Sequence, residues 1–188
     1  MRIYYVTPEM PLAGEGELLS SMIEEGVECV HLRHPLCSCG DIERILKEIP
    51  HNLRNKVSLH DFHHLAIDYG CGVHLNGRHP YAPDGYRGRV SRSCHSLEEI
   101  INSNVDYCFI SPVFDSISKS GYKAGKFDMD LLKELLCKNN IVALGGISPD
   151  KFAALKSLGF SSVALSGYLT GEGNPTEIIK RLQICFNS

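Results

Sequence analysis

The residues of this sequence best suited to chemistry are its histidines. Six of the nine lie at or just beyond the ends of short apolar runs: His31, His34, His60, His74, His79 and His95. Imidazole titrates near pH 6.5, so a histidine at the end of a buried segment can exchange a proton under physiological conditions. A single histidine is more often structural, but this grouping favours a role in proton transfer for at least one of them.

A second set of residues is suited to binding an anion. Gly145 and Gly146 follow one apolar run, and Ser166 and Gly167 follow the next. Glycine lets backbone N–H groups approach an anion closely, and the N-terminus of a following helix adds positive potential. We therefore expect these four residues to bind a phosphate. The alternative is that the glycines only form tight turns.

The elements that must position these residues alternate along the chain. Short apolar runs, rich in β-branched and aromatic residues, predict strands at 2–7, 28–33, 57–60, 72–75, 89–93, 107–111, 141–144 and 162–166. Apolar residues at helical spacing predict helices at 16–25, 41–49, 129–137 and 149–158.

Eight strands with intervening helices predict an α/β fold, a compact single-domain (β/α)₈ TIM barrel over residues 1–188. Such barrels typically have about 250 residues, so the connections here must be short. Segment 76–88, with its prolines and glycines, has room only for a degenerate fourth helix. A doubly wound open sheet is the alternative. In a barrel, polar residues at the C-terminal ends of the strands converge on one site.

Composition restricts the partners. The net charge of −3 and the pI of about 6.3 provide no basic field for nucleic acid. No apolar stretch approaches the roughly 20 residues that cross a bilayer, and the N-terminus lacks the pattern of a secretion signal. We expect a cytoplasmic protein that binds neither nucleic acid nor membrane. Cys37 and Cys39 have no second pair at zinc-finger spacing, so we interpret them as incidental thiols.

A set of short motifs occurs in a fixed order along the chain: Tyr4-Tyr5-Val6-Thr7, His31-Leu32-Arg33, Gly72-Val73-His74-Leu75, Ser93-Cys94-His95-Ser96-Leu97-Glu98-Glu99, Asp106-Tyr107 with Ser111-Pro112-Val113-Phe114, Ala143-Leu144-Gly145-Gly146-Ile147 and Val163-Ala164-Leu165-Ser166-Gly167. Together they resemble the thiamine phosphate synthase/TenI family over nearly the whole chain. The resemblance implies a barrel that handles a small phosphorylated thiazole in thiamine biosynthesis, with the phosphate at the four residues named above. It also implies a homodimer, because family members commonly dimerise.

The resembled family has two branches. The synthase joins hydroxymethylpyrimidine diphosphate to thiazole phosphate and uses Mg²⁺, whereas the TenI-like tautomerase aromatises a thiazole carboxylate phosphate without a cofactor. The synthase pattern after the second strand is Gln-x-Arg-x-Lys, and after the third it is Asn-Asp. This chain has His31-Leu32-Arg33-His34-Pro35 and His60-Asp61, and His79 aligns with the second Mg²⁺-binding aspartate. Losing a carboxylate and a lysine weakens the charge neutralisation that Mg²⁺ and a pyrophosphate need.

The resemblance therefore favours the tautomerase and assigns the catalytic acid/base role to His95. Ser96 is the better N-cap for the helix that follows, which leaves His95 free to face the barrel mouth. The residues expected to bind substrate are His31, Arg33, His60, Asp61, His74, Ser93, Ser116, Ser118 and Lys119. Arg33 suits bidentate contact with a carboxylate or phosphate, and a surface ion pair is its alternative.

Three other functions stay open. One is a thiamine phosphate synthase with an altered pyrophosphate site, in which Asp61 binds Mg²⁺. A second is a non-catalytic binder of thiazole phosphate, which would not depend on His95. In the third, strand-end histidines with Asp61 hold a transition metal in a hydrolase. Assays with each substrate and metal analysis would distinguish them.

Overall fold

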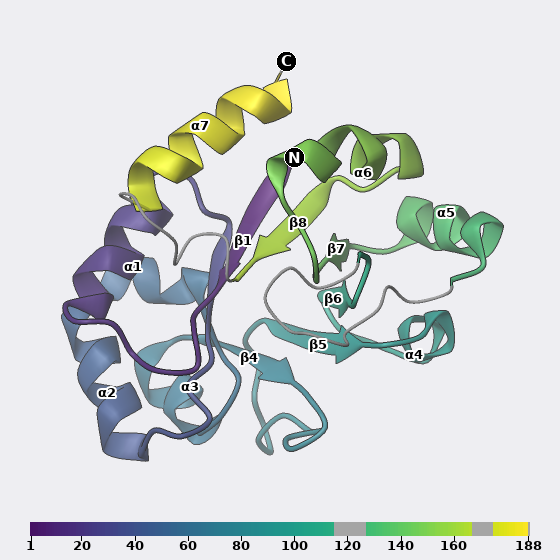
Figure 1. The fold of residues 1–188 in the computed structure, drawn as a ribbon. Coiled ribbons are helices and arrows are strands. Elements are labelled where there is room, and N and C mark those ends of the chain that lie inside the picture. The colour runs from purple at the N-terminus through teal and green to yellow at the C-terminus, as the bar shows by residue number, and fades with distance from the viewer. Residues whose placement is uncertain (115–126, 167–174, 188) are drawn as a thin grey trace.

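The computed structural model contains eight parallel strands that close into a barrel (Figure 1). It describes residues 1–114, 127–166 and 175–187. The strands are β1 (Arg2–Val6), β2 (Cys29–Leu32), β3 (Val57–Leu59), β4 (Gly72–Leu75), β5 (Val90–Cys94), β6 (Tyr107–Ile110), β7 (Ile141–Ala143) and β8 (Ser162–Leu165). β8 pairs back to β1, with Ile3 in register with Val163. This closure confirms the predicted barrel and excludes the open doubly wound sheet.

Helices surround the strands, with α1 to α3 on one side of the barrel and α4 to α6 on the other (Figure 1). They are α1 (Glu15–Glu24), α2 (Cys39–Glu48), α3 (His64–Tyr69), α4 (Leu97–Ile101), α5 (Met129–Lys138), α6 (Phe152–Leu158) and α7 (Pro175–Asn187), with 3₁₀ turns η1 (His51–Lys56) and η2 (Pro149–Lys151). The predicted helix 149–158 is thus a 3₁₀ turn followed by α6. The connection between β4 and β5 contains no helix, so even the degenerate fourth helix expected in segment 76–88 is absent.

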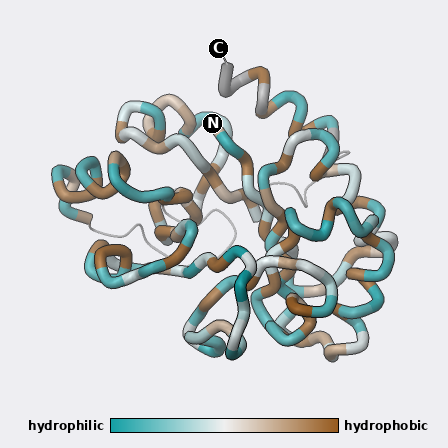
Figure 2. The backbone as a smooth tube through the Cα atoms, turned by 180° about the vertical axis from the view of Figure 1, so that it is seen from behind, coloured by the Kyte–Doolittle hydropathy of each residue, from teal (hydrophilic) through white to brown (hydrophobic). Residues whose placement is uncertain are grey.

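Hydropathy follows this layered arrangement. Along the helices, hydrophobic and hydrophilic residues alternate, so that each helix has an apolar face (Figure 2). Leu19 and Met22 of α1 and Leu46 of α2 are fully buried in the larger hydrophobic core. Within the part of the chain that the structure describes, no helix is both long and apolar enough to cross a bilayer.

Side-chain alternation along the strands separates a second, smaller core from the first. Tyr4 on β1, Cys29 on β2, and Tyr107 and Phe109 on β6 form this second cluster, while Val30 of β2 belongs to the larger one. Because successive side chains of a strand point to opposite faces, one face of each strand lines the barrel interior. This alternation gives His31, two residues after Cys29, an inward-facing position in β2.

Candidate functional site

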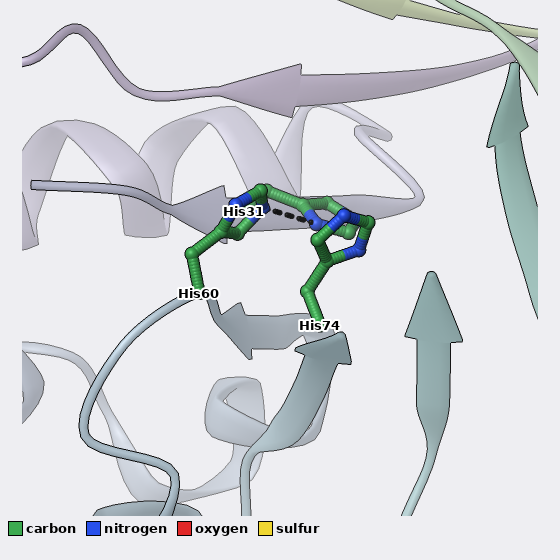
Figure 3. Close-up of side chains that lie close together, drawn as sticks. All are labelled: His31, His60 and His74. Atoms are coloured by element: carbon green, nitrogen blue, oxygen red, sulfur yellow. Dashed lines mark hydrogen bonds between the residues drawn. The ribbon is translucent and has the colours of Figure 1, made fainter. Parts of the chain in front are cut away.

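Three histidines from neighbouring strands meet inside the barrel (Figure 3). His31 lies on β2, His60 directly follows β3, and His74 lies on β4; we call them the histidine cluster. His31 and His74 have 0% of their surface exposed and His60 has 6%. The His60 and His74 rings stack with centroids 4.0 Å apart, and His31 meets both edge-on. The structure therefore brings together three of the residues expected to bind substrate, but in a buried position.

Hydrogen bonds hold the rings of the histidine cluster. His31 Nδ1 lies 3.1 Å from His60 Nε2 (dashed in Figure 3), and His31 Nε2 lies 2.9 Å from the Tyr107 hydroxyl. His74 Nδ1 and Nε2 each lie 2.8 Å from a serine hydroxyl, those of Ser91 and Ser93. Burial and the neighbouring imidazoles lower the pKa of all three rings, that of His74 to about 3. The rings are therefore neutral at pH 7.

Asp61, the predicted Mg²⁺ ligand of the synthase alternative, is bound by positively charged and polar neighbours. Arg78 Nη2 contacts both carboxylate oxygens of Asp61, at 2.8 and 3.1 Å, and His79 Nε2 lies 3.1 Å from Oδ1. Among the described residues, Asp61 belongs to no group of three or more potential metal ligands. A Mg²⁺ ion would have to displace a bidentate guanidinium, so these residues do not fit the ion.

Arg33 follows β2 and forms the ion pair that was its alternative role. Its Nη1 lies 3.6 Å from Glu9 Oε1, and its side chain stays 30% exposed. The Arg33 backbone N–H donates to Thr7 Oγ1 at 2.8 Å, which ties the loops after β1 and β2 together. The guanidinium is therefore held at the mouth of the barrel while part of it remains accessible to an anion.

His95, the predicted acid/base, lies after β5 and is exposed. Its backbone N–H donates to Glu99 Oε2 at 2.7 Å, and Ser96 Oγ accepts from the Glu99 N–H at 3.2 Å. Ser96 thus caps α4 as predicted. His95 Nδ1 lies 3.0 Å from the Ser111 carbonyl oxygen, which can only accept, so Nδ1 carries the proton. In the neutral ring Nε2 is then the basic nitrogen, and no residue that the structure describes hydrogen-bonds to it.

The predicted anion site at the end of β7 has a tight backbone. Gly145 and Gly146 have φ angles of 92° and 65°, in the left-handed region that favours glycine. A Cβ atom at Gly145 would lie 2.9 Å from Pro112 Cα, and the Phe114 N–H donates to the Gly145 carbonyl at 3.1 Å. Ser166 follows β8 and is half-buried. This geometry suits both a tight turn and an anion site, so phosphate binding stays a prediction.

Other predicted residues fall elsewhere. Ser116, Ser118, Lys119 and Gly167 lie outside the residues that the structure describes, so their roles remain predictions. Cys37 and Cys39 are free thiols, and Cys39 Sγ lies 3.4 Å from His64 Nε2. Neither cysteine joins a group of three potential metal ligands among the described residues.

Some residues that contact the predicted site had been given no role in it from the sequence. Ser91 and Tyr107 hydrogen-bond to the histidine cluster, and Arg78 neutralises Asp61. The two-residue period of β5 would have placed Ser91 on the same face as Ser93, which was predicted. Nothing local marks Arg78, because its partner is 17 residues away.

Residues 3–169 match the model of the family described as thiamine monophosphate synthase. The chain belongs to this family. This confirms the resemblance seen in the sequence, and it makes thiamine biosynthesis the context of the protein. Both branches fall within the expected resemblance, so the choice between them depends on the site.

Solved structures with the same barrel fold include two thiamine phosphate pyrophosphorylases. A thiamine phosphate pyrophosphorylase from Bacteroides thetaiotaomicron is 29% identical, with a TM-score of 0.82 over 100% of this chain and 98% of that one. One from Pyrococcus furiosus is 19% identical, with a TM-score of 0.77 over 99% and 95%. N-(5'-phosphoribosyl)anthranilate isomerase from Pyrococcus furiosus, 13% identical with a TM-score of 0.63 over 100% and 99%, shares the fold.

Proposed function

We propose that this protein is a tautomerase that shifts a proton on a phosphorylated thiazole carboxylate, with His95 as acid and base. The observation that carries the proposal is that the Asp61 carboxylate is already paired within the protein. The carboxylate on which the synthase alternative depends for Mg²⁺ is bound by Arg78 and His79. A proton shift needs no pyrophosphate leaving group, so the chemistry does not require that carboxylate to be available.

The hydrogen bonds of His95 suit reversible proton transfer. The Ser111 carbonyl accepts from Nδ1–H, so Nε2 can take a proton from a ring carbon of the substrate. The same carbonyl then stabilises the imidazolium until Nε2 returns the proton to the position that completes the aromatic ring. A positioned general acid/base of this kind typically contributes about 10²–10⁴-fold to the rate.

Contacts between successive loops support a shared site for base and phosphate. His95 after β5 contacts Ser111 after β6, and Phe114 after β6 contacts Gly145 after β7. In our proposal, the phosphate binds to the backbone of Gly145, Gly146, Ser166 and Gly167, and Arg33 pairs with the carboxylate. The ligand would then be held at both ends while His95 reaches its ring.

A thiamine phosphate synthase is the second candidate. The name of the 29% identical Bacteroides thetaiotaomicron structure, thiamine phosphate pyrophosphorylase, favours it. In this chain it would require Arg78 to release Asp61 and Lys119 to supply positive charge. We rank it second because two changes from the synthase pattern lie at or beside this carboxylate. His60 replaces the asparagine that precedes Asp61, and His79 hydrogen-bonds to Asp61 itself.

A paired assay tests the proposal. One arm supplies the non-aromatic thiazole carboxylate phosphate in the presence of EDTA, and the other supplies hydroxymethylpyrimidine diphosphate, thiazole phosphate and Mg²⁺. We expect isomerisation in the first arm and no pyrophosphate release in the second. Pyrophosphate release without isomerisation would instead establish the synthase.

The matched variants are His95→Ala and His51→Ala, since both histidines are exposed and only His95 contacts the loop after β6. His95→Ala should lower kcat by about 10²–10⁴-fold, and His51→Ala should leave it unchanged. A loss below about tenfold in His95→Ala would assign the proton transfer to another residue.

A further inference from the structure

We propose that the histidine cluster is a binding site for a divalent transition metal ion of the Zn²⁺ class, independent of the proton transfer assigned to His95. One nitrogen from each of His31, His60 and His74 lies within 4.8 Å of the other two. Three imidazoles with a fourth position left open are a common ligand set for Zn²⁺.

The distances between imidazole nitrogens in the cluster are close to those that surround a tetrahedral Zn²⁺ ion. Tetrahedral Zn²⁺ with Zn–N distances near 2.0–2.1 Å places ligand nitrogens about 3.3–3.4 Å apart. His31 Nδ1 and His60 Nε2 are already 3.1 Å apart. The ring of His74 has to approach by a small movement, and its partners Ser91 and Ser93 are hydroxyls that can rotate with it.

The protonation state also suits a metal. Neutral imidazoles offer lone pairs without first losing a proton, and burial keeps all three rings neutral at pH 7. With the proton of His31 on Nε2 and that of His60 on Nδ1, both facing nitrogens can coordinate. This change of tautomer moves protons between nitrogens and alters no net charge.

Groups for orienting the ligands are present around the cluster. Tyr107 contacts His31 Nε2, and a serine hydroxyl contacts whichever nitrogen of His74 does not coordinate. Such partners fix the ring orientation and tautomer of metal-binding histidines. A set of nitrogen ligands selects Zn²⁺, Co²⁺, Ni²⁺ or Cu²⁺ over Mg²⁺ and Ca²⁺. A doubly charged ion among neutral ligands also favours an anion, such as hydroxide, in the fourth position.

The test is a Co²⁺ titration of the full-length protein after chelator treatment, monitored by visible absorption. We expect one equivalent to give the intense bands of a tetrahedral site, Zn²⁺ to abolish them, and Mg²⁺ to have no effect. NMR of the Co²⁺ form should show hyperfine-shifted imidazole N–H signals from three histidines. Absence of saturable Co²⁺ binding, or fewer histidine signals, would overturn the proposal.

Variants locate the ion. His31→Gln removes one ligand and introduces the residue of the synthase pattern at this position, and it should weaken Co²⁺ binding by at least about 100-fold. Cys39→Ser and His64→Ala are the controls, because those two side chains form an exposed sulfur–nitrogen pair. Binding that survives His31→Gln but disappears in the controls would refute the cluster. Tautomerase activity is measured separately in EDTA, so each proposal can fail alone.

Discussion

The histidine cluster and His95 use the same side chain in opposite ways. Inside the barrel, His31 and His74 are held at both ring nitrogens and excluded from water. After β5, His95 is held at Nδ1 only, and its ring is exposed. A ring fixed on both sides in a dry environment keeps one protonation state, whereas proton exchange with a ligand requires an accessible nitrogen.

Nearness to a strand end therefore does not by itself define the role of a histidine. The inward face of β2 and β4 carries histidine into the barrel core, but one residue beyond β5 the chain has already turned toward helix α4. We therefore expect substitutions in the cluster to affect stability and metal binding, and substitutions at the loops after β5 to β8 to affect chemistry and ligand binding.

The largest expected effect is on the free energy of unfolding. His74→Ala should destabilise the protein by about 2–5 kcal/mol, because it leaves a cavity and removes hydrogen bonds to Ser91 and Ser93. His95→Ala should cost no more than about 0.5 kcal/mol, since the side chain is exposed. Urea unfolding of both variants measures the difference. Equal destabilisation by His74→Ala and His95→Ala would contradict the structural role assigned to the cluster.

Ligand binding should respond next, at the glycine turn after β7. Gly146→Asp should raise the Kd for the phosphorylated thiazole at least tenfold more than Gly146→Ala does. Both variants strain a residue whose φ is 65°, but only aspartate places a negative charge against the phosphate. Calorimetric titration of the two proteins provides the comparison. Similar Kd values for the two variants would show that the phosphate does not bind at this loop.

The pH dependence of stability should come from the histidine cluster and not from His95. The cluster histidines have lowered pKa values in the folded state, so below about pH 6.5 the unfolded chain binds more protons than the native protein. Stability should therefore be fully present above pH 6.5 and fall with acidification, by up to about 1.4 kcal/mol per pH unit for each histidine. The loss for His74 continues down to a pKa of about 3.

Unfolding curves between pH 5 and 8 check this expectation, and His31→Gln should reduce the slope while His95→Ala should not. A slope that is the same in both variants would show that the acid sensitivity arises outside the cluster.

The smallest effect is expected at Asp61. Arg78→Ala removes a bidentate partner whose own side chain is 50% exposed, so stability should fall by no more than about 1 kcal/mol. Our proposal also expects no Mg²⁺-dependent release of pyrophosphate by this variant. The appearance of that activity would mean that Arg78 alone suppresses a synthase, and the second candidate function would then take first place.

Much of the fold could be predicted because its signals are local. Examples are the strands that begin at Val57 and Gly72, the cap at Ser96 and the helix end at Gly159, which all depend on residues close together in the chain. Alternating apolar runs and turn residues specify these features wherever they occur. Even the order of the motifs, and hence the family, needs no contact between distant residues.

The partners of the site residues required the tertiary structure. His34, which the sequence groups with the strand-end histidines, instead forms a buried pair with Glu15 at 2.7 Å. Tyr107 reaches His31 from a strand 76 residues later, and Arg78 reaches Asp61 from a different loop.

The amino-acid sequence alone determined the positions of the eight strands and the family of the protein, because periodicity and turn chemistry act over a few residues. Only the tertiary structure decided which histidines are buried and which, such as His95, are exposed. The reason is that strand register and barrel closure set those distances, and both arise from contacts between residues far apart in the chain.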